Sequence, residues 1–164
     1  MRKLIVLTMF FLFISAAAHG EIIEKYDRFT KKTTVNTKPE ARCFFKGRPF
    51  LVLNAEFKNK PIYFQIMFTT MQDGWEYLRC HTTHILADDV PVKIPDATHT
   101  GDVQSGGDVI EFICINLISL KSLDQLCKAK KIEVKICNDV FELDDEEKQD
   151  LKDFRTILNK KLAK

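Results

Sequence analysis

The sequence predicts an α+β fold, in which an antiparallel β-meander is followed by a helix–hairpin–helix C-terminal portion. Residues 50–116 contain successive runs in which apolar and polar side chains alternate, which is the period of a β-strand. Residues 118–164 contain two segments whose apolar side chains recur every three or four positions, as in amphipathic helices. Because strands and helices are segregated along the chain, we expect helices on one face of an antiparallel sheet. A β-sandwich with a peripheral terminal helix is the alternative architecture.

Residues 1–20 have the features of a secretory signal peptide. Arg2 and Lys3 precede an apolar run over residues 4–14, and small side chains follow it. A helix over that run would rise about 16 Å, against about 30 Å for the hydrocarbon core of a bilayer, so a spanning anchor is disfavoured. Cleavage is expected after Gly20, with Ala18 as the alternative. The mature protein is therefore expected to be exported, periplasmic or secreted, and soluble, with no membrane anchor.

Residues 21–49 are poorly patterned, and we expect the single α+β domain to span residues 50–164. Four apolar side chains could share one face of a short helix, namely Ile22, Ile23, Tyr26 and Phe29. The polar stretch at 30–39 is typical of a linker or an edge strand.

The predicted meander begins with two clear strands. Apolar side chains occupy every second position of residues 51–57 and 62–68. The Asp-Gly pair at 73–74 is typical of a tight turn, so a third strand is expected within residues 75–86. A short apolar stretch at 91–94 would follow as the last strand of this meander.

Residues 95–107 are rich in glycine and small polar side chains, which predicts an exposed, mobile loop. Residues 108–116 are apolar on both faces apart from Glu111. This pattern predicts a central strand that is buried on both sides.

The C-terminal third is expected to form helix, hairpin and helix. Residues 118–131 carry the helical period, and residues 132–143 contain two short alternating runs with a tight turn at 138–139. Asp144 can cap the last helix, and Glu147 stands three residues further on, as in a capping box.

The charge balance excludes two classes of protein. The chain has 25 Lys and Arg against 23 Asp and Glu, and Arg2 and Lys3 account for the whole surplus. A neutral mature chain argues against nucleic-acid binding and against a polybasic membrane surface, because both need a positive field. Acidic side chains dominate residues 61–120, and some could form a loop that faces a basic partner. The candidates are Asp88, Asp89, Asp96, Asp102 and Asp108.

The mature chain contains five cysteines, an odd number, so at least one is not bonded to another cysteine of the same chain. An oxidising compartment permits disulfides. The first pairings to consider are Cys80 with Cys114, which share apolar strands, and Cys127 with Cys137, which lie on the first helix and the hairpin after it.

The string Cys80-His81-x-x-His84, with His99 further along, contains the donor types that zinc accepts. On an extended strand, however, Cys80 and His84 would point to one face and His81 to the other, so they could not converge on one ion without a bulge. We therefore keep a metal site as an alternative and expect no cofactor.

The sequence contains no recognisable catalytic motif, and we assign no catalytic residue. The strands carry apolar side chains on both faces, which leaves a sheet face in need of a cover. We therefore expect a non-catalytic protein that binds another protein, or a ligand held on the sheet. The alternative is a small exported enzyme or metal-binding protein centred on the Cys80-His81-x-x-His84 string.

Overall fold

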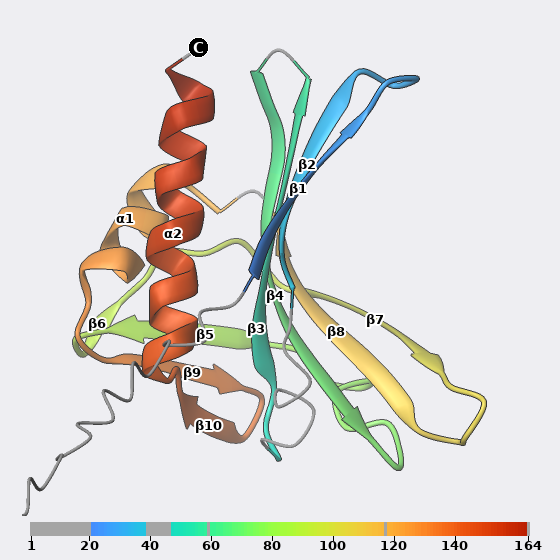
Figure 1. Ribbon diagram of the computed structural model, residues 1–164. Coiled ribbons are helices and arrows are strands. Elements are labelled where there is room, and N and C mark those ends of the chain that lie inside the picture. Colours follow the sequence, from blue (N-terminus) through green and yellow to red (C-terminus); the bar gives the residue numbers. More distant parts are fainter. Residues whose placement is uncertain (1–20, 39–46, 59, 117, 164) are drawn as a thin grey trace, which may run out of the picture.

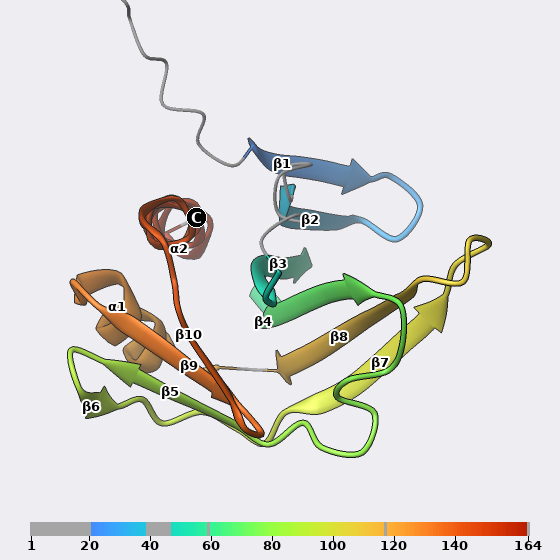
Figure 2. The same ribbon diagram turned by 90° about the horizontal axis from the view of Figure 1, so that it is seen from below.

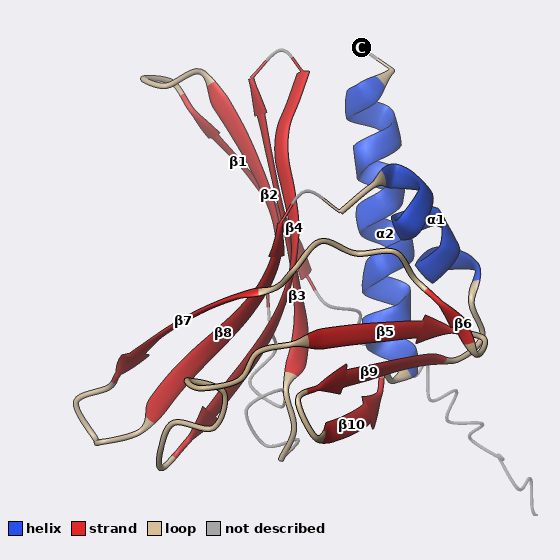
Figure 3. Cartoon of the chain, turned by 180° about the vertical axis from the view of Figure 1, so that it is seen from behind, coloured by secondary structure: helices blue, strands red, loops and turns tan. Residues whose placement is uncertain are grey.

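Two antiparallel sheets and two helices make up the part of the chain that the computed structural model describes, which is residues 21–38, 47–58, 60–116 and 118–163 (Figure 1). The predicted α+β class is confirmed. Both helices lie on the same side of the larger sheet as the smaller sheet does (Figures 2 and 3). The C-terminal helix is thus part of the main layer structure, unlike in the β-sandwich alternative. No helix among the described residues is long and apolar enough to cross a bilayer.

The larger sheet has six strands in the order β1-β2-β3-β4-β8-β7, with every neighbouring pair antiparallel. Its strands are β1 (Glu21–Asp27), β2 (Lys32–Lys38), β3 (Phe50–Lys58), β4 (Lys60–Gln72), β7 (Thr98–Val103) and β8 (Val109–Asn116). The smaller sheet has four, in the order β10-β9-β5-β6. They are β5 (Thr83–Ala87), β6 (Val90–Pro91), β9 (Ile132–Ile136) and β10 (Asp139–Glu142).

The continuous meander is a wrong prediction. β3 and β4 pair as expected, but β4 then pairs with β8, which comes from much later in the chain. After β4 the chain crosses to the smaller sheet through residues 73–82, which contain no strand, and only the end of the predicted third strand becomes β5. Residues 92–97 cross back to the larger sheet.

Two segments are more regular than their composition predicts. Residues 21–38 form the β1–β2 hairpin, so the short helix is wrong. The stretch expected to be a linker or an edge strand contains β2, which pairs with β1 and β3 and is an inner strand, so that expectation is wrong as well. The predicted mobile loop at 95–107 contains β7, which pairs with β8 along its whole length. Gly101 in β7 is a packing glycine, because a Cβ there would lie 2.6 Å from the Trp75 ring. In both segments, pairing with a neighbouring strand overrides weak local patterning.

The helices match the prediction. α1 (Leu120–Lys128) begins at Ser119, whose side chain accepts from the Ser122 N–H. α2 (Asp145–Leu162) begins with the expected capping box between Asp144 and Glu147. The hairpin before α2 turns at Cys137, which has a positive φ of 57°, one residue before the predicted turn.

One continuous core lies between the inner face of the larger sheet, the smaller sheet and the helices. The larger sheet contributes Leu53 and Ile66, the smaller sheet Val134, and the helices Leu123 and Phe154, all almost fully buried. β8 is an inner strand, as expected, and alternate residues bury its inner face. Its other face is only partly buried apart from Cys114, so the expectation of burial on both sides is wrong. This core fixes β5 against β9 and so positions the site described below.

The disulfide joins Cys80 to Cys137, with 5.9 Å between the two Cα atoms, so both expected pairings are wrong. Cys114 is unbonded because its neighbours in β8 point into the core, and it therefore points to the opposite face of the larger sheet. Cys127 is also unbonded, and its Sγ contacts the Leu151 carbonyl oxygen of α2 at 3.4 Å. The fifth cysteine, Cys43, lies outside the described residues.

Candidate functional site

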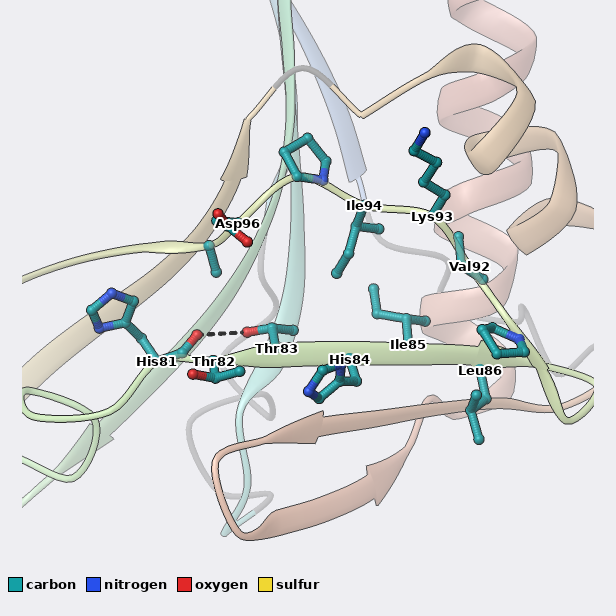
Figure 4. A pocket seen from close by; sticks show the side chains of 13 residues that line it. His81, Thr82, Thr83, His84, Ile85, Leu86, Val92, Lys93, Ile94 and Asp96 are labelled. Carbon is teal, nitrogen blue, oxygen red and sulfur yellow. Dashed lines mark hydrogen bonds between the residues drawn. The ribbon is translucent and has the colours of Figure 1, made fainter.

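A pocket of about 600 Å³ opens between β5 and the segment that crosses back to the larger sheet (Figure 4). Two continuous stretches line it, residues 81–86 along β5 and residues 91–97 opposite them. We refer to residues 92–97 as the return segment.

The pocket exists because the pairing between β5 and the chain after it stops early. The ladder between β5 and β6 contains only two residue pairs, and its last bond runs from the Val92 N–H to the Ile85 carbonyl oxygen, at 2.9 Å. Pro91 and Pro95 lack an N–H group, so this part of the chain is poorly suited to extending the ladder.

Helix α1 holds the return segment away from β5. The Ser122 hydroxyl, on the first turn of α1, donates to the Lys93 carbonyl oxygen at 2.6 Å. Ser122 is buried, which shields this bond from water. The Gln125 side chain adds a weaker contact with the Pro91 carbonyl oxygen at 3.4 Å. The gap beside β5 is therefore a maintained feature of the fold.

The edge of β5 that faces the pocket carries free backbone groups. The Cys137 N–H donates to the Thr82 carbonyl oxygen at 2.9 Å, so the backbone groups of Thr82 point toward β9. Backbone groups alternate in direction along a strand, so those of Thr83 point toward the pocket. β6 pairs only with Leu86 and Ala87 and does not reach them. The N–H and carbonyl oxygen of Thr83 therefore have no strand partner in the described part of the chain.

The side chains give the pocket an apolar end and a polar end. Ile94 and Ile85 point toward one another across the gap (Figure 4). Ile85 belongs to the core, and Ile94 packs against it. His81 and Asp96 lie at the other end. The Thr83 hydroxyl, between the two ends, donates to the His81 carbonyl oxygen at 2.9 Å.

His81 connects the pocket to a buried polar cluster. Its Nδ1 is buried and has no hydrogen-bond partner among the described residues. Its ring stacks on His99, with 6.0 Å between ring centroids and 24° between planes. His99 Nε2 in turn lies 2.9 Å from Oε1 of Glu111, which is fully buried.

Glu111 fixes the loop that leads into the pocket. Its two carboxylate oxygens accept from the backbone N–H groups of Glu76 and Tyr77, at 2.7 and 2.9 Å. The Tyr77 hydroxyl donates to Asp139 at 3.0 Å. Burial, and then the charge of Glu76, raises the pKa of the Tyr77 phenol above its ordinary value, so it stays protonated as a donor. With the Cys80–Cys137 disulfide, these bonds hold residues 76–81 in place.

The structure does not bring the candidate metal ligands together. Cys80 is bonded to Cys137 and cannot supply a thiolate. His84 is exposed on the outer face of β5, whereas its neighbours Thr83 and Ile85 are buried. Of the four candidate ligands, His81 and His99 are the pair whose side chains contact each other, through their stacked rings. The described residues contain no group of three or more His, Cys, Asp or Glu side chains placed to hold a metal ion.

The five candidate acidic residues do not form one loop. Asp88 and Asp89, both with positive φ, make the turn between β5 and β6, and Asp88 accepts from the N–H groups of Lys130 and Lys131. Asp102 lies in β7 and Asp108 just before β8. Only Asp96 lines the pocket.

Three residues that position the site have no conspicuous sequence signal: Thr83, Ile94 and Ser122. The signal that could have indicated them is the Pro91–Pro95 spacing around a short apolar stretch, because two prolines next to a strand leave its edge unpaired.

No protein-family model matches the chain, and no curated protein matches it significantly.

Proposed function

We propose that this is an exported, non-catalytic binding protein whose ligand occupies the pocket between β5 and the return segment. The observation that supports this most directly is that the fold keeps the pocket open. The Ser122 bond and the two prolines separate chain segments that could otherwise close on each other.

The size and lining of the pocket also support a binding role. Ligand sites commonly have volumes of about 300–1,000 Å³, apolar walls and a few polar groups that set orientation. Here Ile85 and Ile94 supply the apolar wall, while His81, Asp96 and the backbone of Thr83 supply polar groups. A partly apolar ligand with a hydrogen-bonding or cationic end fits this distribution.

The Thr83 hydroxyl is placed for structure rather than for chemistry. The Thr83 hydroxyl donates to the His81 carbonyl oxygen instead of to a histidine ring, as an activated nucleophile would. Export is proposed from the signal-peptide pattern of residues 1–20, and the Cys80–Cys137 disulfide is consistent with an oxidising compartment.

The proposal can be tested by NMR with a library of small fragments added to the ¹⁵N-labelled mature protein. Ile94→Trp places a large ring in the pocket, and Val103→Trp adds the same ring at an exposed site at the end of β7. Fragments should shift the amide signals of Thr83 and Asp96 in the wild type and in Val103→Trp, but not in Ile94→Trp. Binding at other positions only, or equal binding to both variants, would contradict the proposal.

A further inference from the structure

We propose that the ligand is an extended peptide segment of another protein, which adds as a strand to the free edge of β5. This inference rests on the proposed binding function and specifies its partner. The arguments are the backbone groups at that edge, the space beside it and the side chains around it.

The edge offers the hydrogen-bonding pattern that a strand requires. The N–H and carbonyl oxygen of Thr83 point into the pocket, as shown above. The Ile85 N–H points the same way, because the Ile85 carbonyl oxygen accepts from Val92 on that side. None of these three groups has a described backbone partner. Donor, acceptor and donor in this order match the groups that an added strand presents.

The space suits an extended chain of limited length. From residue 81 to residue 85, an extended chain covers about 13 Å, which corresponds to four or five guest residues. The Val92–Ile85 bond closes the pocket at one end. The chain's own return segment is poorly suited to pair with β5, because Ser122 holds Lys93 and because Pro95 has no N–H to donate.

The side chains around the edge favour a particular peptide. Side chains of a guest strand alternate in direction, so every second one would point toward Ile85 and Ile94, where a β-branched apolar residue fits. Asp96, at the polar end, is exposed, and no ion pair joins it to a basic side chain among the described residues. A Lys or Arg of the peptide would pair with it. The preferred ligand thus has alternating Val or Ile residues and a basic residue at one end.

The first test is selection from a phage-displayed library of random octapeptides on the mature protein. Peptides with alternating Val or Ile and a terminal Lys or Arg should be enriched on the wild type and not on Ile94→Trp. Asp96→Asn should remove the preference for the basic residue, whereas Asp102→Asn, which removes the same charge from β7, should leave it unchanged. A library that yields no peptide specific for the open pocket would overturn the inference.

The second test separates strand addition from occupation by side chains alone. The best peptide is synthesised in three forms, unmodified and N-methylated at either set of alternate amides, so that side chains are kept while backbone donors are lost. One N-methylated form should bind at least about tenfold more weakly, as expected for the loss of one or two hydrogen bonds. In the complex, hydrogen exchange should slow at the Thr83 and Ile85 amides but not at the His84 and Leu86 amides, which face β9.

The outcomes distinguish the two proposals. Equal affinity of all three peptide forms, with no slowing at Thr83, would refute strand addition while leaving a binding pocket. If fragments bind in the pocket but no peptide does, strand addition is likewise refuted and the binding pocket remains. If neither fragments nor peptides bind at the pocket, the proposed function fails as well.

Discussion

Replacing Glu111 by alanine should destabilise the protein more than any single exposed substitution. The buried carboxylate accepts from two backbone N–H groups and lies 2.9 Å from His99 Nε2. Its removal leaves the buried Tyr77 N–H without an acceptor, which costs about 1–3 kcal/mol. The Glu76 N–H and the His99 ring lose the same carboxylate as a partner, which adds a cost of similar size. We therefore expect Glu111→Ala to lower the free energy of unfolding by about 3–5 kcal/mol.

The measurement is urea denaturation followed by circular dichroism at neutral pH, with the disulfide intact. Glu111→Gln keeps an acceptor oxygen and should cost less, so it serves as the test if the alanine variant does not fold. The matched control is Glu56→Ala on the same sheet, which removes only a half-exposed ion pair with Lys32. That variant should change stability by less than about 1 kcal/mol. A Glu111→Ala variant as stable as the control would show that the carboxylate does not anchor the loop.

Three further outcomes are expected. Reducing the Cys80–Cys137 disulfide, which closes a loop with a sequence separation of 57, should lower the free energy of unfolding by about 4 kcal/mol, measured by urea denaturation with and without dithiothreitol. Burial raises the pKa of the Cys127 thiol to about 11. The free energy of unfolding should therefore be constant up to about pH 9 as far as this thiol is concerned, and should fall between pH 9 and 11 as the unfolded chain loses the thiol proton first. Cys127→Ala should abolish that part of the pH dependence. Ser122→Ala should cost about 1 kcal/mol and weaken ligand binding, whereas Thr156→Ala, which removes an exposed hydroxyl-to-carbonyl bond on α2, should affect neither.

Features that depend on neighbouring residues in the chain could be predicted from the sequence. The capping box of α2 needs only Asp144 and Glu147 at the right spacing. The alternation of apolar residues in β3 likewise reflects which face of that strand is buried.

Features that depend on distant partners could not be predicted. β7 contains Gly101 because the Trp75 ring packs there, although the same glycine resembles a loop residue in the sequence. Cys80 meets Cys137 only because β5 pairs with β9. The pocket depends on a bond between Ser122 and Lys93, 29 residues apart, and neither residue type suggests such a contact.

The position of the pocket has a mechanical consequence. One wall of the pocket is β5, a strand of the smaller sheet, and the opposite wall is the return segment, through which the chain passes back to the larger sheet. A ligand that contacts both walls would therefore connect the smaller sheet to the segment that leads into the larger sheet. The free energy of binding would then oppose separation of the two sheets. Saturation with the ligand should therefore raise the melting temperature of the whole molecule, and its effect should extend beyond the edge of β5.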